Sequence, residues 1–128
     1  MGLLNITHRE KEGEKKPTRY YSKRQEDKIA STLSGNRTKN SGATVWQKGD
    51  VLLDRWLLEA KTKTSHSQSI SIQKEWIEKN NKEALFMGKE YNAIVFNFGP
   101  DEKNYYIIDE HLFQTLVEYL DRKEEDVK

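Results

Sequence analysis

Three short apolar segments follow one another near the middle of the chain, and their spacing restricts the fold more than any other feature. The pairs at 48–49 (Lys-Gly) and 54–55 (Asp-Arg) separate these segments, and both pairs are candidates for tight turns between strands. The pattern therefore predicts an antiparallel meander. Its strands fall within residues 44–46, 51–53 and 56–60.

Helical patterns lie on both sides of this meander. Ser22, with Gln25 three residues later, has the form of a capping box, and apolar residues then recur at helical spacing until Gly35 provides a stop. A second helix is expected at about 71–87, with Ser71 as a possible N-cap and a glycine directly after its end. The two helices therefore bracket the strands.

Two further strands and a third helix complete the predicted order. Residues 93–98 and 105–108 are rich in β-formers, and 99–104 has the composition of a turn. Residues 110–120 repeat apolar side chains at helical spacing, which predicts a helix with one buried side. The stripe expected to be buried consists of Leu112, Phe113, Leu116, Val117 and Leu120.

The length of 128 residues is typical of one domain, whose core needs no disulfide or structural metal. Residues 1–18 lack sustained apolar periodicity and carry mixed charge, so we expect a flexible N-terminal arm there. The domain then covers 19–122, and 123–128 form a charged C-terminal tail.

The composition excludes several classes of site. The chain has no cysteine, which rules out a disulfide framework, a cysteine-bound zinc and a thiol nucleophile, and which suits a reducing compartment. No apolar run approaches the roughly 20 residues that cross a bilayer. We therefore expect a soluble protein of the cytoplasm, or of the host cytoplasm if the source is a virus, with no membrane partner.

Charge is unevenly distributed along the chain. The net charge is only +1, although 34% of the residues are charged, and basic residues are concentrated between Lys11 and Lys48. This first third could contact phosphate groups. The alternative is a solvated, partly disordered leading segment, as charge runs usually are.

One segment of the meander has the residues for metal-dependent chemistry. Alternation along a strand points Glu59 and Lys61 to one face and Leu58 and Ala60 to the other, and a turn at 54–55 brings Asp50 beside Glu59. Two neighbouring carboxylates repel each other and usually need a bound cation, and their oxygens suit Mg²⁺, with Mn²⁺ as a substitute. The alternative is an exposed ion pair between Glu59 and Lys61.

Glu26 is a second acidic candidate. It precedes the apolar residues of the first predicted helix by three, four and seven positions, so it occupies the inward stripe of that helix. A carboxylate in this place needs a partner. That partner is either a metal site or a neighbouring lysine at the edge of the stripe.

Together these residues resemble the PD-(D/E)xK nuclease superfamily. The resemblance rests on Glu26, a Ser-Gly-Ala loop at 41–43, Gly49-Asp50, and the Glu-Ala-Lys run at 59–61, followed by a helix and two strands. It covers about 22–113 and is greatest with the archaeal-type Holliday junction resolvases, including those of phages. The proline that usually precedes the aspartate is Gly49 here.

The resemblance implies an α/β fold of the restriction-endonuclease-like kind, an αβββαββ core whose central mixed sheet is flanked by helices. It also implies that Asp50 and Glu59 bind Mg²⁺ with the backbone carbonyl of Ala60, and that Lys61 positions or activates water. Glu26 would hold a second metal or its water. Such enzymes act as homodimers that cut four-way (Holliday) junctions, a branched DNA.

Several polar residues are candidates for DNA contacts. Ser41 could touch the scissile phosphate, and the predicted loop around it and the start of the second helix could bind the DNA backbone. Ordinary solvated polarity is the alternative for all of them. The other candidates are Arg37, Lys39, Lys63, Gln73 and Lys74.

The sequence thus predicts a metal-dependent, structure-specific endodeoxyribonuclease. Two alternatives remain open. One is another DNA endonuclease of the superfamily, of the repair or restriction type, although the short chain has little room for a base-reading insertion. The other is a catalytically silent DNA-binding protein of the same fold.

Overall fold

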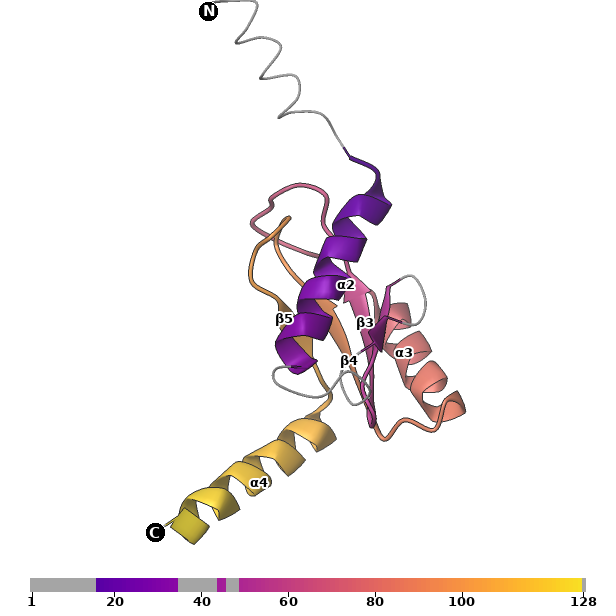
Figure 1. Cartoon of the computed structure of the whole chain (residues 1–128). Coiled ribbons are helices and arrows are strands. Elements are labelled where there is room, and N and C mark those ends of the chain that lie inside the picture. Colours follow the sequence, from indigo (N-terminus) through magenta and orange to yellow (C-terminus); the bar gives the residue numbers. More distant parts are fainter. Residues whose placement is uncertain (1–15, 35–43, 46–48, 128) are drawn as a thin grey trace, which may run out of the picture.

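The computed structural model describes residues 16–34, 44–45 and 49–127, which form an α/β fold with a mixed open sheet (Figure 1). The predicted order of elements is confirmed, and a helix follows the last strand. The elements are α2 (Thr18–Ser34), β1 (Thr44–Val45), β2 (Asp50–Leu52), β3 (Trp56–Lys61), α3 (Lys74–Phe86), β4 (Tyr91–Phe96), β5 (Tyr105–Ile107) and α4 (Glu110–Val127).

The sheet has the order β1-β2-β3-β4-β5, with four strands of three or more residues and the two-residue β1 at one edge. The predicted meander is confirmed, because β1, β2 and β3 pair in antiparallel fashion. Backbone hydrogen bonds between Leu53 and Trp56, of 3.0 and 3.4 Å, close the turn at 54–55. β3 and β4 pair in parallel, with α3 as their crossover.

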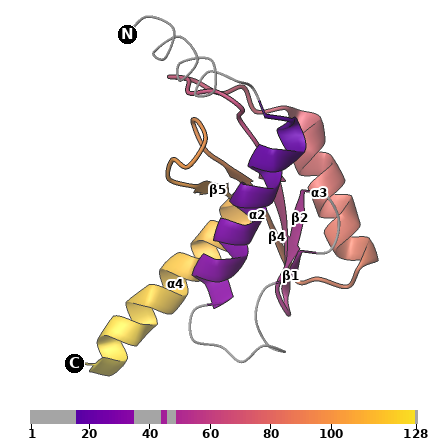
Figure 2. The same ribbon diagram turned by 45° about the horizontal axis from the view of Figure 1, so that its top comes forward.

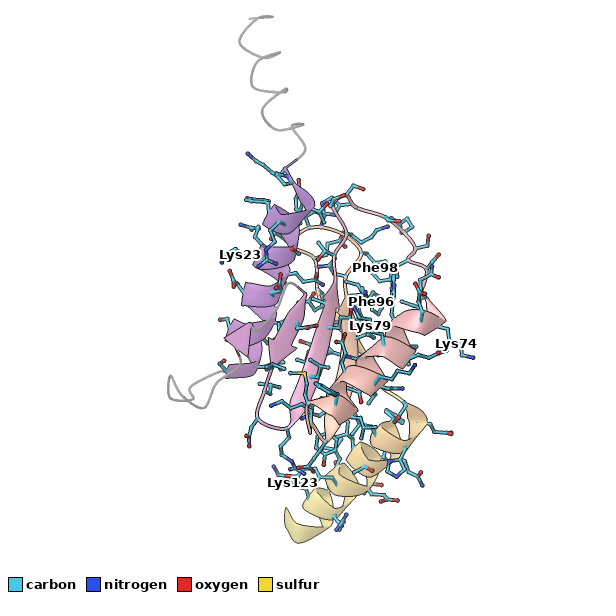
Figure 3. The ribbon with its side chains drawn as sticks, turned by 90° about the vertical axis from the view of Figure 1, so that its right-hand side faces the viewer. Lys23, Lys74, Lys79, Phe96, Phe98 and Lys123 are labelled. Carbon is cyan, nitrogen blue, oxygen red and sulfur yellow. The ribbon has the colours of Figure 1, made fainter. Side chains whose placement is uncertain are left out.

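Helices α2 and α3 lie on opposite faces of the sheet (Figures 2 and 3). The alternation of side chains sorts the strand residues accordingly. On the α2 face, Leu58 and Ala60 pack with Ile29, as the strand pattern predicted, and Val51, Ala93 and Val95 complete this core. On the α3 face, Leu57 and Ile94 are buried where α3 covers β3 and β4, and Ala84 of α3 is buried as well.

The predicted starts of two helices are wrong. α2 begins at Thr18, so Ser22 lies inside the helix, where its hydroxyl donates to the carbonyl of Arg19 at 3.2 Å instead of capping the end. α3 is preceded by Gln73, not Ser71, and Gln73 makes no side-chain cap hydrogen bond. The predicted stop is confirmed, because Gly88 adopts a φ of 71° directly after the helix.

α4 differs most from expectation. It continues to Val127, through most of the segment predicted as a tail. Of the stripe predicted to be buried, only Leu112 is, while Phe113 and Leu120 remain 60% and 59% exposed. The reason is visible in Figure 1, where α4 leaves the end of β5 and extends away from the sheet. Helical spacing in the sequence shows that one side of a helix is apolar, but it does not show what packs against that side.

Among the helices described by the structure, none combines the length and the apolar character that crossing a membrane requires.

Candidate active site

The hairpin of β2 and β3 brings two acidic side chains together. Asp50 is the cross-strand partner of Glu59, as the sequence predicted, and both are buried, with 6% and 7% exposure. Residues directly opposite in an antiparallel pair have Cβ atoms about 5 Å apart. Both lie on the opposite face from Leu58 and Ala60, and hence on the side of α3.

The surroundings of Asp50 disfavour its negative charge. Burial raises its pKa from 3.8 to about 6, and the charges of Glu83, Glu59 and Glu26 add to this effect, while Lys79 opposes it. Glu83 and Lys79 belong to α3, where they form an ion pair of 3.6 Å. The site therefore contains more negative charge than its own lysines neutralise.

Glu59 retains one unused acceptor. Its Oε1 accepts a hydrogen bond from Lys61 Nζ at 3.1 Å, whereas its buried Oε2 has no hydrogen-bond partner. A buried acceptor without a partner costs about 1–3 kcal/mol. This oxygen is therefore available to a cation or to a bound water.

Lys61 lies between Glu59 and an aromatic ring. Its ammonium is 4.6 Å from the centroid of Trp76, at the start of α3. The alternative interpretation was an exposed ion pair of Glu59 with Lys61. The ion pair is present, but it is not exposed, because the two side chains are only 9% and 24% exposed. A surface ion pair is therefore not an adequate description of this site.

Glu26 is fully buried, with 0% exposure, on the inward side of α2, as predicted. Its Oε1 accepts from the amide of Gly49 at 3.1 Å, and its Oε2 forms an ion pair with Arg19 at 2.6 Å. Its partners in the structure are thus an arginine and the backbone next to Asp50, not a lysine at the edge of the stripe. Glu26 anchors the start of β2.

Gly49 adopts a φ of 92°, which proline cannot adopt, so the usual proline would not fit this backbone. Its carbonyl accepts from the amide of Ala60 at 2.6 Å, while its own amide points to Glu26. The carbonyl oxygen of Ala60 lies 3.7 Å from the place that a Cβ on Gly49 would take. The predicted backbone ligand is therefore at the same end of the hairpin as Asp50.

A polar cluster that was not predicted from the sequence supports the end of β3. Gln25, predicted only as part of a capping box, is 5% exposed and donates to the carbonyl of Lys61 at 3.1 Å. Thr62 donates to the Gln25 side chain at 2.8 Å. The only signal in the sequence was the position of Gln25 beside Glu26 on the inward side of a helix. Glu83 and Lys79 were missed because nothing in the sequence places α3 over Asp50.

The structure describes three of the six candidate DNA contacts. Arg37, Lys39 and Ser41 lie outside the described residues. Lys63 is partly buried just after β3, and Gln73 is exposed ahead of α3. Lys74 is 90% exposed, pairs with Glu78 at 3.9 Å, and extends away from the sheet (Figure 3).

The oxygen atoms of this site suit Mg²⁺, which is often bound by few ligands from the protein. Within the described ranges, no group of three or more His, Cys, Asp or Glu side chains is arranged to hold a metal ion. Mg²⁺, however, is commonly bound by one or two carboxylates together with waters and substrate phosphates. Asp50, Glu59 with its unpartnered oxygen, and the Ala60 carbonyl meet that requirement.

Comparison with models of known protein families gave no match, and neither did comparison with curated proteins or with solved structures.

Proposed function

We propose that the chain is a Mg²⁺-dependent endonuclease that hydrolyses phosphodiester bonds in branched DNA. The observation that carries the proposal is the pairing of buried Asp50 with buried Glu59, whose Oε2 has no partner, beside Lys61 on the same face. Phosphodiester hydrolysis needs a hard cation and a further positive charge near the attacking oxygen. This pair and its lysine would provide the binding site and that charge.

Each residue then has a distinct role. Asp50 and Glu59 would hold the ion, assisted by the carbonyl of Ala60. When bound, the ion supplies a water of lowered pKa and neutralises charge on the phosphate. Lys61 Nζ lies 3.1 Å from Glu59. With Glu59 bound to the ion, the ammonium of Lys61 would be free to contact the phosphate or the attacking water.

Glu26 contacts the backbone of the site in the folded chain. Its bond to the Gly49 amide fixes the residue before Asp50, and this supports a positioning role. The direct role that the resemblance implies, holding a second metal or its water, requires Arg19 to release Oε2. It stays a prediction, tested below.

The order of elements supports the finer fold assignment. An α-βββ-α-ββ order with an antiparallel β2–β3 hairpin and a parallel β3–β4 pair fits the restriction-endonuclease-like core. Within that group, four-way junctions are the substrate that we propose, cut by a homodimer with two sites. A repair or restriction endonuclease would use the same residues on a different substrate.

The direct test is cleavage of a synthetic four-way junction beside a linear duplex of the same arm sequence, with and without Mg²⁺. We expect Mg²⁺-dependent cuts in the junction and little cutting of the duplex. Cutting of both DNAs at similar rates would favour another nuclease of the superfamily. Absence of cutting under all metal conditions would contradict the proposal.

One observation favours a second candidate, the catalytically silent DNA-binding protein. Lys61 already neutralises Glu59 in the folded chain, as a stabilising ion pair would. Titration calorimetry with Mg²⁺ or Mn²⁺ separates the two functions, because a silent protein needs no cation at Asp50. Binding that is lost in Asp50→Asn would favour the nuclease.

A further inference from the structure

We infer that α4 and the groove beside it form a surface through which two copies of this chain pair. The inference begins from apolar side chains of α4 that the described residues leave exposed. Four residues lie on one side of α4 at spacings of three, one and three: Phe113, Leu116, Val117 and Leu120, here called the α4 stripe. Their exposed fractions are 60%, 37%, 38% and 59%.

The other side of α4 is polar. Helical spacing places four exposed residues opposite the stripe: His111, Thr115, Glu118 and Arg122. A helix with one apolar and one polar side usually gains most of its stability by packing the apolar side. α4 has the pattern of a packed helix but extends away from the sheet (Figure 1).

An apolar groove of about 400 Å³ adjoins the stripe, and Leu116 belongs to both. The groove lies on the α2 side of the sheet, between the end of α2, the β2–β3 turn and the start of α4. Apart from Leu116, it is lined by Leu33, Leu53, Trp56, Leu58, Ala93, Tyr106 and Ile108. One surface thus carries an apolar ridge and an apolar groove next to each other.

This adjacency favours a second copy as the occupant. In a pair related by a two-fold axis the same patch contacts itself, so the ridge of each copy can cover the groove of the other. The stripe alone exposes on the order of 300–400 Å² of apolar surface, about half of the roughly 800 Å² per partner that a stable interface covers. The groove adds to this area, and polar residues at the rim of both would supply the rest of the contact.

The inference does not depend on nuclease activity. It rests on exposed side chains far from Asp50 along the chain, and its test measures mass, not cutting. Failure of junction cleavage would therefore leave it standing.

The first test is the molar mass of the full chain by light scattering. The chain has a mass of 15.1 kDa, and we expect twice this value at micromolar concentration. Leu120→Lys should return the mass to that of the monomer, and cooperative unfolding should show that the rest of the domain stays folded. The matched control is Leu85→Lys, because Leu85 is 82% exposed on α3, outside the stripe, and the same change there should leave the dimer intact.

The second test uses the absence of cysteine from the chain. Val117→Cys, at the centre of the stripe, should be protected from a thiol-specific reagent in the dimer, whereas Thr115→Cys on the polar side should react freely. A monomeric wild type, which is also the result if another part of the same chain covers the groove, would overturn the inference. A dimer that survives Leu120→Lys, or that Leu85→Lys disrupts, would overturn it as well.

Discussion

Ionisation of the Asp50 carboxylate destabilises the folded chain relative to the unfolded chain. Its pKa is about 6 in the folded chain, against an ordinary value of 3.8, chiefly because the side chain is buried. The folded state therefore binds this proton more tightly than the unfolded state. The contribution of Asp50 to stability is greatest at low pH and is lost as the pH rises from about 4 to about 6.

Asp50→Asn should consequently stabilise the metal-free protein at pH 7, by on the order of 1 kcal/mol, while it abolishes cutting. The gain should be small at pH 3, where both states of the wild type are largely protonated at this position. Denaturant unfolding in EDTA at the two pH values measures it. Asp54→Asn, in the exposed turn, is the control for the loss of one negative charge. A loss of stability in Asp50→Asn at pH 7 would contradict the argument.

Lys61 should matter for chemistry more than for the fold. Lys61→Ala removes the positive charge beside Glu59 and should abolish cutting, because that charge acts on the phosphate or the attacking water. Stability in EDTA should fall by about 1–3 kcal/mol, since Glu59 Oε1 then loses its partner as well. Mg²⁺ should restore much of this loss, and Lys82→Ala, an exposed lysine on α3, serves as control. Mg²⁺-dependent cutting by Lys61→Ala at wild-type rates would refute the assignment.

Two variants of Glu26 distinguish a role in metal binding from a role in anchoring the start of β2. Glu26→Gln keeps one oxygen for the Gly49 amide, so unfolding should change far less than in Glu26→Ala, which leaves that amide without its acceptor. We expect Glu26→Gln nevertheless to lose most of its cutting activity, because a neutral amide attracts no cation. Rates from a single-turnover assay decide the matter. Near-normal cutting by Glu26→Gln would leave Glu26 only its anchoring role.

At the scale of elements, the β2–β3 hairpin was predictable and its surroundings were not. Strand alternation and a two-residue turn are local, and they suffice to place Asp50 opposite Glu59. The partners of Glu26, by contrast, come from another turn of its own helix and from the start of β2. Burial of the α4 stripe was wrongly predicted because burial depends on what packs against a helix, which periodicity does not contain.

Gly49 connects the conformation of the hairpin to the site. Among the described residues, a Cβ at this position would meet only the Ala60 carbonyl at 3.7 Å, so the penalty of Gly49→Ala comes from its φ of 92°. We expect a loss of about 1–2 kcal/mol in unfolding free energy and a marked loss of cutting, since Asp50 follows directly.

Gly88→Ala provides the matched control for this change. Gly88 has a φ of 71° and open space around it, so its strain is similar, but it lies at the far end of α3. It should lose stability without a comparable loss of cutting. Equal losses of activity in the two variants would show that Gly49 acts only through overall stability.

At the scale of the whole molecule, the charge pattern sets how DNA would be held. The net charge is +1, so no general attraction to DNA is expected and the contacts must be local. Two basic residues of α2 already have acidic partners, Lys23 with Asp27 at 2.9 Å and Arg24 with Asp101 at 2.7 Å. Exposed ion pairs of this kind are worth little, so phosphates can replace the carboxylates at small cost.

Binding should therefore weaken steeply as salt rises and depend little on base sequence, with each phosphate contact contributing about 0.9 to the slope of log K against log salt. Discrimination must then come from branch geometry. Two sites at a fixed separation in a dimer can engage two strands of a junction together, which a linear duplex does not offer.

This preference for junctions can be measured by comparing junction and duplex binding across a salt series in Ca²⁺, which supports binding in place of Mg²⁺. Leu120→Lys should abolish the preference for junctions but leave duplex affinity unchanged. Equal affinity of the wild-type chain for both DNAs would defeat the junction proposal, while the metal site at Asp50 and Glu59 would still stand.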